Sequence, residues 1–130
     1  MSVKVTGMDK MLSNLEKELG QKAVQRISDA ALTDAAEIFL DELKRQFESW
    51  SDKGYSIEEM TLSKPFWEGG TRTIKVYWKG PHDRYRIIHL NEFGTVKNPN
   101  PDGKGSIARA IRNSEKPYHN AIRRAVERGI

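Results

Sequence analysis

The feature that most constrains the fold is the segment from residue 21 to residue 49, which lacks glycine and proline and is rich in alanine. Apolar side chains recur along it at helical spacing, with charged side chains on the opposite face. At 1.5 Å per residue such a helix is roughly 40 Å long. The pattern predicts a long helix as the spine of a single domain over residues 1–130. Its apolar face comprises Val24, Ile27, Ala31, Ala35, Ile38, Leu43, Phe47 and Trp50.

Shorter elements are predicted on both sides of this helix. Residues 8–19 carry apolar side chains at helical spacing and stop at Gly20, which indicates a short amphipathic helix. After breaker residues at 49–54, apolar and polar residues alternate over 57–65 and over 71–79. These two runs flank Gly69-Gly70 and predict a β-hairpin. Pro65 makes the first strand an edge or irregular strand.

The C-terminal third is predicted to be mostly helical. Residues 84–93 favour a short helix or helical turn that stops at Gly94, although Ile87-Ile88 also suits a strand. Residues 96–105 hold two Pro, two Gly and two Asn, which indicates an exposed loop. Two helical pieces follow, the second with Ser114 as its N-cap and Pro117 in its first turn. The predicted fold class is α/β of the α+β type, with the long helix and a C-terminal helix packed on a small antiparallel sheet.

The net charge of +4 is distributed unevenly along the chain. Residues 1–65 carry 9 Lys and Arg against 12 Asp and Glu, whereas residues 66–130 carry 13 against 6. A basic half is typical of nucleic-acid-binding proteins. Two halves of opposite charge equally favour head-to-tail packing of identical subunits, because such an interface joins two different patches.

Composition narrows the class of protein further. There is no cysteine, so disulfides and thiolate metal sites are excluded. No apolar run approaches the roughly 20 residues needed to span a bilayer, and the first residues lack the apolar core of a signal peptide. We therefore expect a chain made in the cytoplasm, without membrane contact.

His89 and Glu92 are the strongest candidates for a reactive site. On a helix, their spacing of three places both on one face, as two metal ligands require. A metal site usually needs three or four ligands, and His82 and His119 stand at no ligand-like spacing. No serine lies in a nucleophile elbow, and neither glycine-rich stretch matches a phosphate-binding loop. We expect Glu92 to bond backbone or a cation and His89 to be a packed polar residue. The metal-dependent enzyme, such as a small nuclease, is the less favoured alternative.

The stretch RIIHLNEFGTVKNPNPDGKGSIARAIRNSEKPYHNAI resembles the head–tail joining and tail-completion proteins of long-tailed bacteriophages and prophages. The resemblance rests on the order of elements along the whole chain. These are a helical region from GMDKMLSNLEKEL, an EFGT element, a Pro/Gly loop and an IARAI…AIRRAV helix. The hairpin TLSKPFWEGGTRTIKVYWKGP is similar to relatives from phages of low-GC Gram-positive bacteria. Many members carry Pro-x-Asp-Thr-Gly-x-Leu after the long helix, whereas SWSDKGYSIEEM keeps only Asp52, Lys53 and Gly54.

The resemblance implies a small α/β subunit without enzymatic activity or cofactor. Such subunits form a ring, often six-fold, between the portal-bound connector and the tail tube. The implied partners are copies of the chain itself, connector and tail-tube proteins, with incidental contact to DNA. The chain would assemble in the host cytoplasm and end at the head–tail junction of the virion. A basic nucleic-acid-binding protein is the alternative function.

These considerations define two sets of site residues. Glu92, Phe93, Gly94 and Thr95 are expected to form a structural turn, with Phe93 in the core, Gly94 at positive φ and Thr95 bonded to local backbone. Glu92 would brace the turn or pair with Arg84, Arg86 or a basic residue of the C-terminal helix. Subunit contacts are expected from the loops at 50–56 and 96–105 and from the basic C-terminal face. The candidates there are Lys53, Tyr55, Asn98, Asn100, Lys104, Arg109, Arg112, Arg123 and Arg124.

Overall fold

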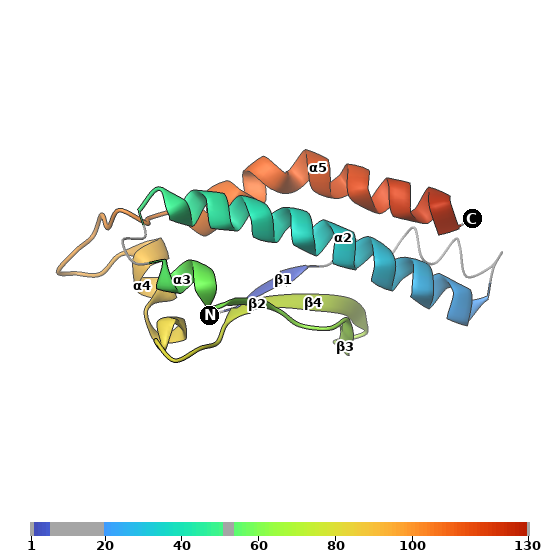
Figure 1. Ribbon diagram of the computed structural model, residues 1–130, viewed down its shortest axis with the longest axis horizontal. Coiled ribbons are helices and arrows are strands. Elements are labelled where there is room, and N and C mark those ends of the chain that lie inside the picture. Colours follow the sequence, from blue (N-terminus) through green and yellow to red (C-terminus); the bar gives the residue numbers. More distant parts are fainter. Residues whose placement is uncertain (1, 6–19, 51–53, 130) are drawn as a thin grey trace.

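The computed structural model describes residues 2–5, 20–50 and 54–129 (Figure 1). The predicted helix over 8–19 and Lys53 lie outside these residues. The elements in chain order are β1 (Val3–Val5), α2 (Gln21–Glu48), α3 (Tyr55–Glu58), β2 (Met60–Leu62), β3 (Phe66–Glu68), β4 (Thr71–Trp78), the 3-10 turn η1 (Arg84–Arg86), α4 (Ile88–Phe93) and α5 (Ser106–Gly129).

Three layers stack with α2 in the middle. The sheet lies against one side of α2, and α5 runs along the other (Figure 1). β4 is the central strand, pairing antiparallel with β1 on one edge and with β2 and β3 in succession. Helices packed on a small antiparallel sheet confirm the predicted α+β class. The predicted packing of the C-terminal helix on the sheet differs, because α5 packs chiefly on α2.

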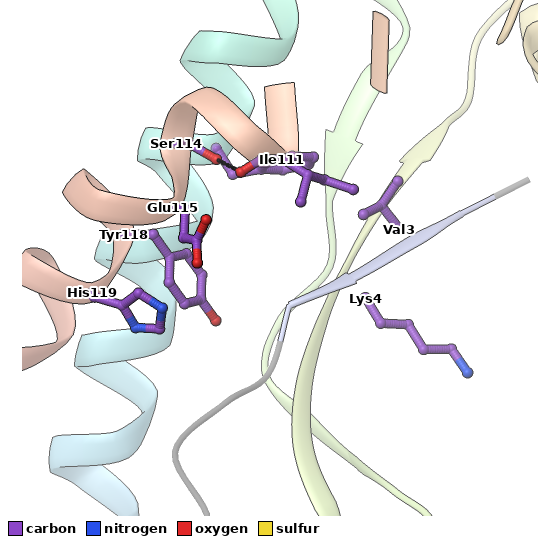
Figure 2. Close-up of a pocket in the computed structure, with 8 residues that line it drawn as sticks. Val3, Lys4, Ile111, Ser114, Glu115, Tyr118 and His119 are labelled. Atoms are coloured by element: carbon purple, nitrogen blue, oxygen red, sulfur yellow. Dashed lines mark hydrogen bonds between the residues drawn. The ribbon is translucent and has the colours of Figure 1, made fainter. Parts of the chain in front are cut away.

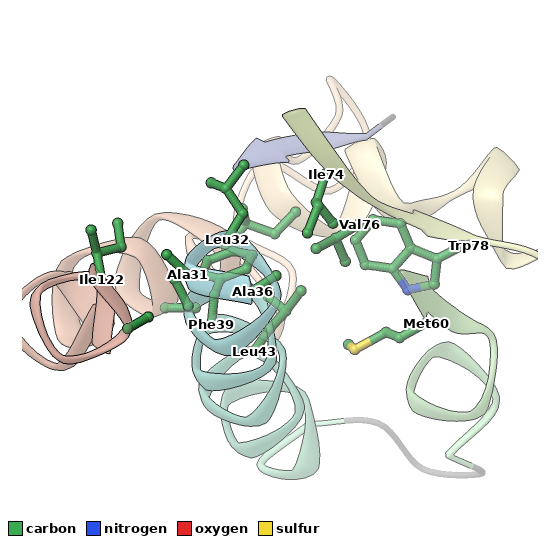
Figure 3. Packing of buried hydrophobic residues seen from close by; sticks show 14 of the residues in the cluster. Ala31, Leu32, Ala36, Phe39, Leu43, Met60, Ile74, Val76, Trp78 and Ile122 are labelled. Atoms are coloured by element: carbon green, nitrogen blue, oxygen red, sulfur yellow. The ribbon is translucent and has the colours of Figure 1, made fainter. Parts of the chain in front are cut away.

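The central position of α2 explains which of its side chains are buried. Figure 3 shows Leu32, Phe39 and Leu43 between Ile122 of α5 and the sheet residues Ile74, Val76 and Trp78. A single apolar stripe does not describe a helix covered on two sides, so the predicted face omitted Leu32 and Phe39. Ile38, which the prediction included, is only half-buried. The predicted bounds of the helix are confirmed within one residue.

The predicted hairpin is confirmed at its second strand and at its turn. Gly69 and Gly70 both have positive φ, 56° and 79°, and Glu68 faces Thr71 across them. A two-residue hairpin turn of type I′ needs positive φ at both positions, which glycine adopts without steric cost.

The first strand was predicted wrongly at its start, because Tyr55–Glu58 forms a helical turn instead. Pro65 has no N–H to donate and divides the remainder into β2 and β3. Ser63 maintains the pairing next to this break: its N–H donates to the Lys75 carbonyl at 2.9 Å, and its Oγ accepts the Lys75 N–H at 2.8 Å. The short strand β1 was not predicted.

The C-terminus is one helix rather than the two pieces predicted. Pro117 lies inside α5, and Ser114 is a buried helical residue whose Oγ donates to the Ile111 carbonyl at 3.3 Å. A proline inside a helix removes one hydrogen bond, here to the carbonyl of residue 113. Burial of Ala110, Ala121 and other small apolar residues against α2 on both sides of the proline keeps the two halves in one helix.

Candidate assembly surface

The turn after α4 is anchored by Glu92. Its side chain is 6% exposed, and its carboxylate accepts the N–H groups of Ile107 at 2.7 Å and Ala108 at 3.2 Å. The Glu92 carbonyl also accepts the Gly105 N–H at 3.0 Å. The first N–H groups of a helix lack partners within the helix and carry partial positive charge. Glu92 therefore caps α5 across the loop, and the expectation that it bonds backbone is confirmed.

Gly94 and Thr95 behave as their residue types predict. Gly94 has φ +82°, and a Cβ atom there would lie 2.6 Å from the Pro99 carbonyl oxygen. The Thr95 N–H donates to the Asn98 carbonyl, and the Asn98 N–H donates to Thr95 Oγ1, both at 2.9 Å. These two hydrogen bonds form a tight turn directly after α4.

The prediction that Phe93 anchors in the core is wrong, because its side chain is 65% exposed. α4 has only six residues, and its inward face is occupied by Ile88 and Glu92, which stand four residues apart. Phe93 therefore points outward. His89 is also exposed, so the expectation that it is a packed polar residue is wrong. α4 and η1 themselves, and the stop at Gly94, are as predicted for residues 84–93.

The far end of the loop is anchored by Trp50, a contact that the sequence did not reveal. A Cβ on Gly103 would lie 2.6 Å from the Trp50 ring, so only glycine fits beneath the indole. The Trp50 Nε1–H donates to Ser106 Oγ at 2.9 Å, and the Ser106 hydroxyl donates to the Gly103 carbonyl at 2.7 Å. The loop between α4 and α5 is thus fixed at both ends and projects beyond the end of α2 (Figure 1). Its residues 96–100 are exposed, as predicted.

Lys104 and Arg109, two of the candidate contact residues, are engaged within the chain. Lys104 Nζ donates to the Pro99 carbonyl at 2.8 Å and to Asn100 Oδ1 at 3.2 Å. Arg109 donates to Gln46 Oε1 at 3.0 Å and to the Lys104 carbonyl at 2.8 Å, so it connects α5, the loop and α2.

Glu42 forms the polar centre of the contact between α2 and α5. Its carboxylate accepts hydrogen bonds from Asn113 and Gln46, both at 3.0 Å, and from Arg45. The hydrogen bond from Asn113, followed by that from Gln46, holds the pKa of this carboxyl below its usual value. Glu42 is therefore ionised at neutral pH.

The outward face of α5 is basic. Arg112, Lys116 and Arg123 are exposed and follow one another at helical spacings of four and seven residues. None of the three forms a hydrogen bond or ion pair within the described part of the chain. Arg124 is exposed at the edge of a groove between α2 and α5, and Arg128 pairs with Asp34 of α2 at 3.0 Å. Arg112, Lys116 and Arg123 are thus cations directed away from the protein.

Tyr55, the remaining candidate, lies in a folded corner rather than on a free loop. Its ring is stacked on His82, with ring centroids 3.5 Å apart and planes at 8°. Nearby, the buried Glu59 accepts the N–H groups of His82 at 2.9 Å and Arg84 at 3.1 Å. The Arg84 side chain is engaged here too, because its Nε–H donates to Ser56 Oγ at 2.8 Å, and it does not pair with Glu92.

His89 and Glu92 do not combine into a reactive pair. Both oxygens of Glu92 are bonded to backbone N–H groups, whereas His89 is exposed. Within residues 2–5, 20–50 and 54–129, no three His, Cys, Asp or Glu side chains are close enough to hold a metal ion. Over the same residues, no helix combines the length and apolarity required to cross a membrane.

A cavity of about 410 Å³ lies between β1 and α5 (Figure 2). Burial raises the pKa of Tyr118 in its wall to about 12, so this phenol keeps its proton at neutral pH. Glu115 and His119 are exposed at its rim, and no hydrogen bond to another described residue orients either as a base. The lining residues are Val3, Lys4, Phe39, Ile111, Ser114, Glu115, Tyr118 and His119.

The geometry defines a protein whose fixed loop and charged surfaces suit assembly. The family model described as "Bacteriophage HK97-gp10, putative tail-component" matches residues 9–94, more than half of the 130-residue chain. The chain belongs to this HK97-gp10-like family of bacteriophage tail components, and its place is accordingly in the virion. No curated protein and no solved structure matches the chain.

Proposed function

We propose that this protein is a structural subunit of a ring that completes the phage tail and joins it to the head connector. Membership of the tail-component family carries this proposal. The loop between α4 and α5 supports it, because a ring subunit must present fixed surfaces to its neighbours. Capping by Glu92 and packing of Gly103 on Trp50 hold this loop in one shape, which lowers the ordering cost of association. The role is architectural and needs neither cofactor nor catalysis.

The exposed candidates divide into two contact regions. Asn98 and Asn100 lie on the loop that projects from one end of the molecule. Arg112, Arg123 and Arg124 lie on the basic side of α5 and suit an acidic neighbouring subunit or passing DNA. The connector and tail-tube proteins are the neighbours expected above and below the ring.

Deletion of the gene from the phage tests this function. Electron microscopy should show DNA-filled heads separated from tails, and wild-type protein supplied from a plasmid should restore joined particles. Complete virions in normal number without the protein would refute the proposal.

A nucleic-acid-binding role is the second candidate, because Arg112, Lys116 and Arg123 form a cationic face that has no ion pair with the residues that the structure describes. It predicts binding to duplex DNA whose log affinity falls by about 0.9 per neutralised phosphate with log salt concentration. The variant R112Q/K116Q/R123Q should then lower this slope by about 3. DNA affinity equal in the two proteins would eliminate this role.

A further inference from the structure

Three large apolar side chains at one end of the molecule are exposed in the part of the chain that the structure describes. Leu90 is 38% exposed, Phe93 is 65% exposed and Val96 is fully exposed. Leu90 and Phe93 lie three residues apart on one side of α4. Val96 follows beyond the end of this helix, after Gly94 and Thr95. We call these residues the apolar patch. Isolated surface apolar residues need no explanation, but a contiguous group marks an interaction site.

The backbone beneath the apolar patch is held firmly. The Gly94 N–H donates to the Leu90 carbonyl at 2.9 Å, and Thr95 and Asn98 bond each other. Glu92 fixes the opposite face of α4 to the start of α5. The patch is therefore presented in one orientation, and covering it costs little conformational entropy.

Charges around the apolar patch restrict the chemistry of its partner. Arg86 and Lys97 are exposed on either side of it in the sequence, and Asp83 offsets part of the Arg86 charge. The chain that flanks the patch therefore carries net positive charge, with Arg86 and Lys97 against Asp83. A complementary surface has an apolar floor with carboxylates at its edge.

The groove between α2 and α5 has this composition. It has a volume of about 280 Å³ and is lined by Asp34, Glu37, Ile38, Asp41, Ala121, Arg124 and Arg128. Ile38 and Ala121 supply the apolar floor. Arg128 pairs with Asp34 at 3.0 Å, and Glu37 and Asp41 form no ion pair with any described residue. Arg124 also lines the groove, so three carboxylates stand against two arginines and leave a net charge of −1. This volume lies below the ~300–1,000 Å³ of small-molecule sites and suits inserted side chains.

We propose that the apolar patch of one copy of this chain docks in the α2–α5 groove of a second copy, with Lys97 facing Glu37 and Asp41. α4 and the loop after it, which carry the patch, lie at one end of the molecule (Figure 1). The groove is lined by the middle of α2 and the C-terminal half of α5, so a copy does not fill its own groove. A contact between two different surfaces is heterologous and generates a ring where the rotation closes. This inference rests on the proposed function and assigns the residues of its self-contact.

The absence of cysteine from the chain permits a direct test by disulfide cross-linking. A phage lacking the gene is complemented with the double variant Val96→Cys/Ile38→Cys, and purified virions are oxidised and run on a non-reducing gel. We expect dimers and higher multimers that reductant removes. The matched control Val96→Cys/Glu127→Cys places the second cysteine on the outward side of α5 and should give no ladder.

Other outcomes of the cross-linking experiment would contradict the proposed contact between two copies. Cross-linking of Val96→Cys to a different virion protein, or no cross-link in virions that contain the double variant, would overturn docking on a second copy while leaving the ring function intact. Absence of even the wild-type protein from virions would overturn the ring function itself.

A charge exchange covers the case in which cysteines at positions 38 and 96 impair assembly. Lys97→Glu should cause loss of joined particles, and the added change Glu37→Lys should restore them. Both variants should melt as the wild type does, since neither side chain has a partner among the described residues. Failure of Glu37→Lys to rescue Lys97→Glu, or normal assembly by Lys97→Glu alone, would overturn the proposed contact.

Discussion

At the scale of single residues, Gly94 and Glu42 show how the role of a residue depends on the groups that the fold brings into contact with it. Gly94 needs both a positive φ and an absent side chain, because Pro99 closes against it. Glu42 is charged in a nearly buried position because Asn113 of another helix and Gln46 of its own helix donate to it. For each residue, a substitution and its control test how much these contacts contribute to the stability of the fold.

Gly94→Val should lower the free energy of unfolding by about 1–3 kcal/mol, since it combines left-handed backbone strain with a collision at Pro99. Gly70→Val is the matched control, because Gly70 has φ +79° with open space around its Cβ position. We expect the larger loss of stability for Gly94→Val in urea unfolding. An unchanged melting temperature for Gly94→Val would contradict the role assigned to the turn.

Glu42→Gln should make stability less dependent on pH in the acid range. The pKa of Glu42 is lowered in the folded protein, so its contribution is present above the unfolded pKa of about 4.3 and is lost as pH falls through the folded pKa. We expect the variant to lose about 1–2 kcal/mol at pH 7, and the difference from wild type to shrink as the pH falls below about 4.

Glu37→Gln is the control for this titration, because Glu37 is exposed on the same helix. Thermal unfolding between pH 3 and pH 7 measures both variants against the wild type. A difference between Glu42→Gln and wild type that stays constant over this range would show that the Glu42 charge does not stabilise the fold.

At the scale of elements, α5 is the case in which packing overrides a local signal. Pro117 indicates a helix start, yet the helix continues through it, because small apolar residues on both sides of the proline are buried against α2. The missing hydrogen bond is a local cost that the contact between α2 and α5 outweighs.

Pro117→Ala should therefore raise the free energy of unfolding by about 1–2 kcal/mol. Restoring the helical hydrogen bond and propensity is worth up to about 3 kcal/mol, and the greater entropy of the unfolded chain offsets about 0.4–1 kcal/mol of it. Lys116→Ala, a change at the preceding exposed residue, should have almost no effect. Equal stability of Pro117→Ala and wild type in urea would show that the helix has adapted to the proline.

At the scale of the whole molecule, stability and assembly use different surfaces. The interior contacts join the sheet, α2 and α5, with Arg72 of β4 paired to Asp29 of α2 at 2.7 Å and 2.9 Å. The loop tip, the apolar patch and the outward face of α5 contribute little to this interior. Changes on these surfaces should therefore alter assembly without altering folding.

The variant R112Q/K116Q/R123Q should reduce the yield of joined particles while its melting temperature stays close to that of the wild type. Each exposed change should alter stability by less than about 0.5 kcal/mol. The control K22Q/R26Q/K44Q removes three positive charges from α2 and should leave the yield unaffected. Electron microscopy and calorimetry provide the two measurements, and an equal loss of yield in both variants would indicate an effect of net charge alone.

The amino-acid sequence by itself determined the features whose signal is local. The period of apolar residues predicted α2, the alternation around Gly69-Gly70 predicted β4 and its turn, and residue type predicted the roles of Gly94 and Thr95. Such features depend on backbone preferences and on neighbours within a few positions of the chain. The local sequence is therefore enough to predict them.

Only the tertiary structure decided which surfaces meet. It placed Glu92 under the first turn of α5, packed Gly103 on Trp50, joined the two halves of α5 across Pro117 and left Phe93 facing outward. Each of these outcomes joins groups far apart in sequence or weighs burial against a local cost. The free energy that favours these contacts arises only when the sheet, α2 and α5 pack together. The pattern of residues along the chain therefore does not predict them.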